Sequence, residues 1–222
     1  MIVVHHLNNS RSQRVLWLLE ELEVPYEVKR YERDPKTMRA PKALEAVHPL
    51  GKSPVITDGS VTVAESGAII EYLAGTYGKG RLLPAEGTAE RLRYTYWMHY
   101  AEGSLMPNLL MKLVFSRVDK GKMPFFAKPV ARAISKGAIQ GFIDPEIGKH
   151  LSYVDGELSR GSWFAGQEFS AADVQMSFPL EAAAARGGLA GFKHITGFLD
   201  RIHKRPAYGR ALARGGAYDI LT

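Results

Sequence analysis

The sequence predicts an α/β plus all-α protein, in which a small domain of strands and helices precedes a helical domain. Strand patterns and a hairpin turn occur only in the first third of the 222 residues, whereas long helical periodicities fill the rest. A segment rich in turn formers, Gly78–Pro84, separates the two parts. We therefore expect an N-terminal domain over residues 1–80, a linker over 81–88 and a helical domain over 89–222.

The first half of the N-terminal domain has the order strand, helix, strand. Residues 2–4 are an apolar run typical of a buried strand, and three turn formers at 8–10 end it. Apolar residues then recur at helical spacing over 12–22. Residues 26–31 alternate as a second strand, and a short helix is expected near 43–47.

The second half of this domain is a hairpin followed by a helix. Asp58–Gly59 is a turn dipeptide, and its flanks, 55–56 and 61–63, have the pattern of paired strands. Residues 67–73 continue as a helix. Together with the preceding elements, this order predicts a thioredoxin-like domain whose ligand lies at the strand ends.

Two features beside the hairpin favour a binding site. Pro54 cannot donate to a sheet, and a cis Ser53–Pro54 bond would let the Ser53 backbone pair with a peptide-like ligand as if it were an added strand. Glu65–Ser66 precedes a helix whose first turn has free N–H groups, which bind carboxylates well. The same pair could also serve only as a helix cap.

The succession of a turn-forming Gly51–Lys52, the Ser53–Pro54 pair, the hairpin and Glu65–Ser66 resembles the glutathione-binding half of the glutathione transferases. The chain is similar to this family over its whole length, most sharply over 8–73 and 163–180. The resemblance implies that glutathione is the co-substrate and that no metal is needed.

Family membership would give these residues specific contacts with glutathione. Lys52 would bind the glycyl carboxylate, and the backbone of Ser53 would pair with the cysteinyl unit. Glu65 and Ser66 would bind the γ-glutamyl group. Ser53 stands where Val is commoner in the family, which matters little because the contact is made by backbone. His48 is expected to cap or orient the loop.

Ser10 is the predicted catalytic residue. It lies between the first strand and the first helix, where the helix dipole and a hydroxyl can both stabilise a thiolate. In the serine-type transferases resembling the theta and zeta classes, the catalytic serine precedes an Arg-Val or Arg-Ala, and here Ser10 precedes Arg14–Val15. Ser12 and Asn9 are alternatives, and either serine could act only as a helix cap.

The helical domain is expected to begin with a long helix over 90–114, which Pro107 should kink rather than end. Five residues share its predicted inner face: Tyr94, Trp97, Met98, Ala101 and Leu105. The resemblance implies that the inner end of this helix faces the second substrate and a dimer partner. Glu102 and Ser104 are therefore candidates for lining the second-substrate cleft.

The segment 117–145 is the part least similar to the family. It predicts a helix with an apolar row, Phe126, Val130, Ile134 and Ala138, and an opposite basic row, Lys128, Arg132 and Lys136. A basic amphipathic helix can lie on a membrane surface. We expect instead a packed helix whose basic face is solvated.

A second strong signature, Phe169–Asp173, follows an aromatic segment at 163–164. Ser170 and Asp173 have capping-box spacing ahead of an apolar run, and Phe169 suits a hydrophobic staple. This looks like the capping motif of the transferases' helical domain, and we assign it to folding. Two last helices are expected over 192–203 and 207–213.

Composition excludes several classes of function. The chain has no cysteine, which excludes disulfides, thiolate metal sites and a cysteine nucleophile. His5 and His6 are adjacent in a strand and should point to opposite faces, so we do not expect a metal site there. The net charge is +6, but no nucleic-acid fold motif accompanies it, so no nucleic-acid partner is expected. Neither a leader nor a run of eighteen apolar residues is found, which favours the cytoplasm.

The sequence therefore predicts a serine-type glutathione transferase that conjugates the glutathione thiolate to a small, hydrophobic electrophile. We expect a homodimer, as in the family, and no membrane partner. Two alternatives remain: a ligand-binding protein with the same pocket but no turnover, and a glutathione-dependent peroxidase or isomerase.

Overall fold

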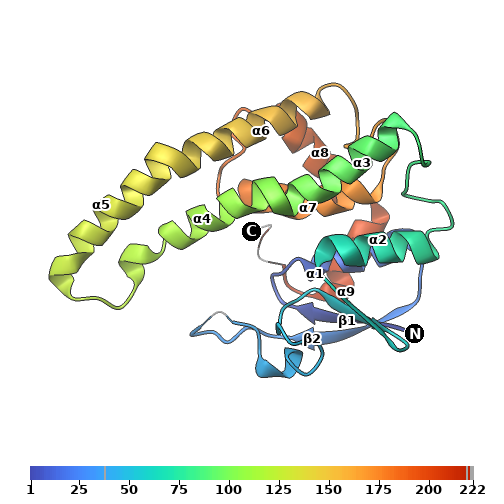
Figure 1. The fold of residues 1–222 in the computed structure, drawn as a ribbon, viewed down its shortest axis with the longest axis horizontal. Helices are drawn as coiled ribbons and strands as arrows, with labels where there is room; N and C mark the ends of the chain where they lie inside the picture. Colours follow the sequence, from blue (N-terminus) through green and yellow to red (C-terminus); the bar gives the residue numbers. More distant parts are fainter. Residues whose placement is uncertain (38, 219, 221–222) are drawn as a thin grey trace.

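The computed structural model describes residues 1–37, 39–218 and 220. In it, a sheet with its helices lies on one side of the molecule and a layer of helices on the other (Figure 1). The predicted fold class, a thioredoxin-like domain followed by an all-helical domain, is confirmed. The predicted end of the helical domain at residue 222 lies outside the described residues.

The sheet consists of four strands in the order β2-β1-β3-β4. Their bounds are β1 Ile2–Leu7, β2 Tyr26–Tyr31, β3 Val55–Asp58 and β4 Val61–Ala64. β1 runs parallel to β2 and antiparallel to β3, and β3 and β4 form the expected hairpin. A single 3₁₀ turn, η1 (Lys42–Leu44), occupies the place of the short helix predicted near 43–47.

Helix α1 (Ser12–Leu22) joins β1 to β2 and is buried on almost every side. It packs on β1 and on α2 (Ser66–Tyr77), and its other side contacts helices of the helical domain. Trp17 is fully buried there, with its ring against Phe169 and Tyr208. Burying one large side chain contributes roughly 1.5–3 kcal/mol. Because Trp17 belongs to α1 and packs on residues of the helical domain, its burial stabilises the contact between the two domains.

The helical domain contains seven α-helices among the described residues. They are α3 Ala89–Tyr100, α4 Met106–Phe115, α5 Lys128–Ala138, α6 Asp144–Leu158, α7 Ala171–Ala184, α8 Lys193–His203 and α9 Pro206–Gly215. None of the helices described is long and apolar enough to cross a membrane.

A π-helical turn, η2 (Ala101–Leu105), joins α3 to α4, so the helix runs on past Pro107 as predicted. The N–H of Met106 bonds to the carbonyl of Ala101, five residues back. A second such turn, η5 (Ile139–Ile143), precedes Pro145 in the same way between α5 and α6. Because proline lacks an N–H and clashes with the carbonyl four residues back, a wider turn before it lets the helix continue.

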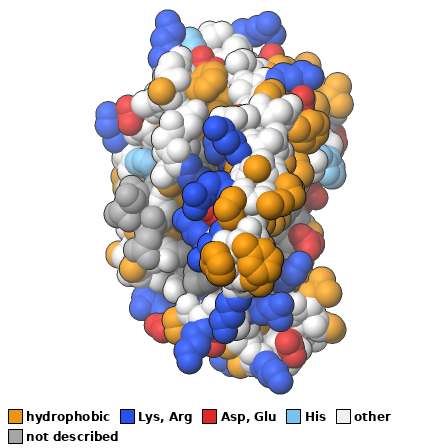
Figure 2. Space-filling view, turned by 90° about the vertical axis from the view of Figure 1, so that its left-hand side faces the viewer, with side chains coloured by type: hydrophobic (Ala, Val, Ile, Leu, Met, Phe, Trp, Pro, Cys, Tyr) orange, Lys and Arg blue, Asp and Glu red, His pale blue; other side chains and the backbone are white. Residues whose placement is uncertain are grey.

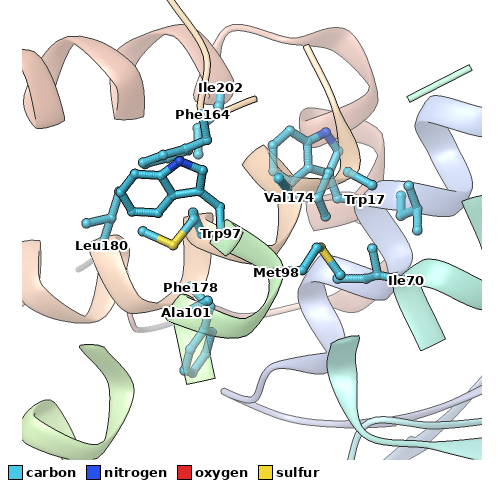
Figure 3. Packing of buried hydrophobic residues seen from close by; sticks show 14 of the residues in the cluster. Trp17, Ile70, Trp97, Met98, Ala101, Phe164, Val174, Phe178, Leu180 and Ile202 are labelled. Atoms are coloured by element: carbon cyan, nitrogen blue, oxygen red, sulfur yellow. The ribbon is translucent and has the colours of Figure 1, made fainter. Parts of the chain in front are cut away.

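The main core is one hydrophobic cluster that extends from β1, α1 and α2 into the helical domain, where α3, α7 and the aromatic segment before α7 contribute to it. All five residues predicted to face inward from 90–114 are buried. Figure 3 shows the Trp97 ring beside Phe164 and Leu180, and Trp17 farther along beside Val174. The Trp97 and Phe164 ring centroids are 4.7 Å apart.

The predicted capping box at the start of α7 is present. The Asp173 carboxylate accepts hydrogen bonds from the N–H and the hydroxyl of Ser170 and from the N–H of Phe164. Burial raises the pKa of Asp173 to about 7, although these donors favour the ionised form. The box therefore fixes both the helix start and the aromatic segment before it.

The prediction for α5 was wrong for its apolar row, although the basic row, Lys128, Arg132 and Lys136, is exposed as expected. Of the predicted row, Phe126, in the 3₁₀ turn before α5, and Val130 and Ile134 are exposed, Ala138 is half-buried, and Ser135 is the buried residue of the helix. The reason is that α4 and α5 project from the body as a narrow arm (Figure 1), so α5 has packing partners along one side only.

Candidate functional site

The turn from β1 into α1 carries the predicted catalytic residue. Asn9 adopts a positive φ of 50°, which asparagine tolerates better than most residues. The chain then turns so that the hydroxyl of Ser10 accepts a hydrogen bond from the N–H of Ser12, at 3.2 Å. Ser10 therefore also supports the first turn of α1, the structural role foreseen for it.

Ser10 and Ser12 belong to one chain of hydrogen bonds. Their hydroxyl oxygens are 2.7 Å apart, and the Ser12 hydroxyl is 2.9 Å from Nδ1 of His6. Ser12 has no exposed surface, whereas Ser10 keeps 4%. Ser10 is therefore the member of this hydrogen-bonded series that a ligand can reach.

The protonation of His6 sets the direction of these hydrogen bonds. Burial, with a smaller effect of Arg30, lowers the pKa of His6 to about 4, so its ring is neutral at pH 7. The ring also bonds to the backbone of Gly215, and because Nδ1 faces Ser12, Nε2 is the nitrogen that donates to this carbonyl. Nδ1 then accepts from the Ser12 hydroxyl, whose oxygen is left to accept from Ser10. The carbonyl of Leu7, 3.4 Å from the Ser12 hydroxyl, is a second acceptor within the turn, so the Ser12 proton is retained there and the proton of Ser10 can rotate toward a ligand.

Ser53 contacts the last residues of β1, close to the turn that carries the two serines. Its hydroxyl donates to the carbonyl of His5 at 2.9 Å and accepts from the N–H of Leu7 at 3.3 Å. The β1–β3 pairing stops at His5 and Val55, so the side chain of Ser53, not its backbone, makes these contacts with β1. The Ser53–Pro54 bond is cis. Because the strand pairs of β3 end at Val55, the Ser53 backbone lies beyond them, at one end of the sheet.

The hairpin register brings Glu65–Ser66 next to Ser53–Pro54. Val55 pairs with Ala64, so the two dipeptides lie directly beyond this pair on neighbouring segments. Glu65 has a φ of 70° and a ψ of 126°. This backbone conformation is unfavourable for a residue with a side chain, typically by about 1–3 kcal/mol, and such strain is concentrated at functional sites.

Ser66 is the first residue of α2 and is buried. The first intrahelical bond of this helix runs from the N–H of Ile69 to the carbonyl of Glu65. The N–H groups of Ser66, Gly67 and Ala68 precede it and are therefore directed out of the helix end. This end can hold a carboxylate group.

Lys52 and His48 lie in the loop that leads into this region. Lys52 is exposed, and the ring of His48 accepts from the N–H of Leu50 at 3.4 Å. The His48 carbonyl accepts from Gly51, which has a φ of 55° and whose added Cβ would lie 2.8 Å from a carbon of Glu45. His48 thus shapes the loop, and a glycine is required at its turn.

Glu102 is engaged in ion pairs that the sequence did not reveal. Its carboxylate accepts from Arg14 at 2.6 Å and from Arg11 at 3.0 Å. Burial alone would raise the pKa of Glu102, but the charges of Arg14 and Arg11 outweigh it and lower the pKa. Arg14 is buried and also donates to the carbonyl of Gln175, so this cluster joins α1 to η2 and α7.

Glu102 and Glu65 nevertheless belong to one surface hollow, lined by Glu65, Gly67, Ala68, Glu71, Met98, His99, Glu102, Gly103 and Gln175. For Ser104, the contact found is between its carbonyl and the side chain of Asn108. A role of Glu102 or Ser104 in binding a second substrate stays a prediction.

His5 and His6 have separate partners, as strand alternation predicted. His5 bonds to Tyr31 and Thr57, while His6 faces Ser12. Within residues 1–37, 39–218 and 220, no group of three or more His, Asp or Glu side chains could hold a metal ion.

Three segments therefore meet at one end of the sheet: the Ser10–Ser12 turn, the loop at Ser53 and the start of α2. They combine hydroxyl donors, free strand-like backbone and a helix end that attracts anions. This combination suits a small, anionic peptide that carries a group needing a hydroxyl donor.

Comparisons with known proteins agree with this chemistry. Residues 1–75 match the family described as "Glutathione S-transferase, N-terminal domain", and residues 142–206 match "Glutathione S-transferase, C-terminal domain". Glutathione S-transferase 3 of Schizosaccharomyces pombe is 41% identical over 93% of this chain and 85% of its own length. The chain belongs to the glutathione S-transferase family.

Solved structures support the assignment. A glutathione S-transferase from Actinobacillus pleuropneumoniae has a TM-score of 0.80 and 34% identity, over 99% of this chain and 95% of its own. A sphingomonad glutathione S-transferase, complexed with glutathione, has a TM-score of 0.73 at 24% identity, over 97% of this chain and all of its own. The latter likeness concerns the fold alone.

Two residues of the candidate site, His6 and Arg14, have contacts that their sequence context did not predict. His6 was considered only as half of a metal pair, although a polar residue in a buried strand needs a hydrogen-bond partner. Arg14 was used only as a family marker, although a charged residue within an apolar helical pattern indicates a buried ion pair.

Proposed function

We propose that this transferase conjugates the thiolate of glutathione to a small, hydrophobic electrophile. One observation supports the proposal most directly: the Ser10 and Ser12 hydroxyls, the Ser53 backbone and the start of α2 lie around the same end of the sheet. Each element matches one part of glutathione: a thiol, a peptide backbone and a terminal carboxylate.

Glutathione would bind in an extended form across this end of the sheet. The backbone of Ser53 pairs with the cysteinyl unit, as an added strand would. The start of α2, with Glu65 and Ser66, holds the carboxylate and the amino group of the γ-glutamyl unit. The exposed ammonium of Lys52 meets the glycyl carboxylate at the other end.

Ser10 would then act on the thiol. Its hydroxyl turns from Ser12 to the sulfur and donates a hydrogen bond that favours the thiolate, while the thiol proton is released to solvent. A fall of about two units in the thiol pKa corresponds to about 2.7 kcal/mol, which a charge-assisted hydrogen bond and the α1 dipole together can supply. The thiolate attacks the electrophilic carbon, a carbon–sulfur bond forms, and the leaving group departs with its electron pair.

We propose in addition that two copies of the chain form a homodimer and that the protein works in the cytoplasm. Both follow from the family resemblance and the sequence. Light scattering of the purified protein measures the dimer directly, and a mass equal to one chain at micromolar concentration would refute it.

The test of the proposed function is a glutathione-dependent screen over aryl halides, epoxides, hydroperoxides and maleyl compounds. Conjugation of an aryl halide or an epoxide supports the proposal. Turnover of only a hydroperoxide or a maleyl compound would replace it with a peroxidase or an isomerase. Glutathione binding by calorimetry without any turnover would replace it with a ligand-binding protein.

A further inference from the structure

The arm formed by α4 and α5 ends in a tip, residues 117–128, that contains two short 3₁₀ turns. The arm projects from the body at the left of Figure 1, so its tip is the part of the helical domain farthest from the sheet's helices. Neither the glutathione end of the sheet nor the ion pairs of Glu102 include a residue of this tip.

The tip presents two phenylalanines to solvent. Phe125 is 85% exposed and Phe126 is 69% exposed, and their rings contact each other edge to face with centroids 5.8 Å apart. The apolar row continues along α5 with Val130 and Ile134, which are 60% and 62% exposed. A continuous apolar surface of this kind marks an interaction site far more often than scattered single residues do.

The packing of α5 strengthens this conclusion, because Val130 and Ile134 face solvent just as the basic residues of the helix do. Ser135 is buried, and Arg132 donates to Asp119 of the 3₁₀ turn that follows α4. A helix that packed only for the stability of the single chain would place its apolar row inward. The outward row therefore has a use outside the single chain.

The tip and the following helix α5 carry a high positive charge. Residues 117–136 contain six basic side chains and one acidic one, Asp119, which is already paired with Arg132. The basic residues are Arg117, Lys120, Lys122, Lys128, Arg132 and Lys136. Figure 2, which looks toward the end of the arm, shows hydrophobic side chains gathered on this face with Lys and Arg side chains beside and below them.

We infer that the arm tip docks on the surface of an anionic phospholipid bilayer. Phe125 and Phe126 would enter the boundary between headgroups and acyl chains, and the lysines around them would bind the anionic headgroups. Charge complementarity selects this occupant over a second copy of the chain, because two tips placed together would bring like charges into contact. The expectation that no membrane is a partner depended on a packed α5, which the structure contradicts. This inference goes beyond the proposed function and does not depend on it.

The experiment is co-sedimentation of the full chain with vesicles of phosphatidylcholine and phosphatidylglycerol, and with vesicles of phosphatidylcholine alone. We expect binding to the anionic vesicles, weakening as salt is added. The double variant Phe125→Ser/Phe126→Ser should bind at least about tenfold more weakly, because both apolar anchors are lost. Lys120→Gln/Lys122→Gln should lose about fivefold per charge.

Matched controls distinguish vesicle binding by the tip from non-specific hydrophobic binding and from an effect of the protein's net charge. Leu92→Ser removes a side chain that is 74% exposed on α3, and Lys193→Gln/Lys204→Gln makes the same charge change on and just after α8. Both should bind anionic vesicles as the wild type does. The thermal midpoint of the tip variants should stay within about a degree of wild type, because exposed side chains contribute little to stability.

Equal binding of the tip variants and the controls would overturn the inference, as would absence of binding to anionic vesicles. A fall in oligomer mass in Phe125→Ser/Phe126→Ser, measured by light scattering, would also overturn it. In that case the tip would be an interface between copies of the chain.

Discussion

Replacing Ser10 and Ser12 separately by alanine should separate catalysis from folding. The hydroxyl of Ser12 is committed to His6, and only Ser10 can turn toward a bound thiol. Ser10→Ala therefore removes a charge-assisted hydrogen bond of about 1.5–3 kcal/mol, which lowers turnover about ten- to hundredfold at neutral pH. Its cost to folding is the lost acceptor for the Ser12 N–H, about 1 kcal/mol.

Ser12→Ala should show the opposite balance. It leaves Nδ1 of His6 buried without a donor, which costs about 1–3 kcal/mol of folding stability. Turnover should fall much less than in Ser10→Ala, because the hydroxyl that meets the thiol is still present.

The assay is the initial rate with an aryl halide from pH 6 to 9, combined with urea denaturation. At high pH glutathione ionises without help, so the rate profile of Ser10→Ala should shift to higher pH while its glutathione affinity stays similar. An alkaline shift in Ser12→Ala and none in Ser10→Ala would refute the reasoning. If neither variant shifts, Asn9 or a backbone amide is the partner of the thiol.

Four further predictions follow from the site. Ser66→Ala should raise the KM for glutathione more than it lowers kcat, because the γ-glutamyl contact is the same in the ground and transition states; initial rates against glutathione test this. Glu65→Gly should relieve the positive φ and make the fold about 1 kcal/mol more stable while weakening glutathione binding, measured by denaturation and calorimetry. Glu102→Gln should cost about 3 kcal/mol of stability, because Arg14 is left buried beside a neutral side chain; denaturation measures this. The wild type should lose up to about 3 kcal/mol of folding stability as the pH falls from 6.5 to 4, since unfolding lets His6 take up a proton that the folded chain excludes. The variant His6→Asn should lack this loss, which denaturation at several pH values measures.

Matched variants serve as controls for these experiments. Glu23→Gly relieves a similar positive φ at the end of α1 and should stabilise without changing glutathione affinity. Glu86→Gln breaks an ion pair of a carboxylate that is 82% exposed and should cost less than about 1 kcal/mol. Ser60→Ala, in the β3–β4 turn, should leave the KM unchanged. A glutathione affinity that falls equally in the Glu23 and Glu65 variants would show that backbone relief, not the site, causes the effect.

Much of the fold could be predicted because its signals are local. The alternation of Tyr26–Tyr31, the Asp58–Gly59 turn and the Ser170–Asp173 capping box each depend on residues close together in the chain. The Glu65–Ser66 pair could be placed beside Ser53 for the same reason, since a hairpin sets its own register.

The remaining features depend on packing between distant segments. The Arg14–Glu102 pair joins residues that are 88 positions apart, and no periodicity in the chain encodes it. The order of donors from His6 to Ser10 depends on the contact of His6 with Gly215 near the C-terminus. The exposed face of α5 could not be predicted either, because a helical pattern shows which residues share a face and not whether a neighbour covers it.

The most direct test of the central claim is the pKa of the thiol of bound glutathione, measured by thiolate absorbance during a pH titration of the binary complex. A cysteine-type thiol in water ionises near pH 8.5. The wild-type complex should titrate about two units lower, and the Ser10→Ala complex about one to two units above the wild type, as the loss of about 1.5–3 kcal/mol requires. Equal thiol pKa values in the two complexes, with glutathione bound in both, would contradict the role of Ser10.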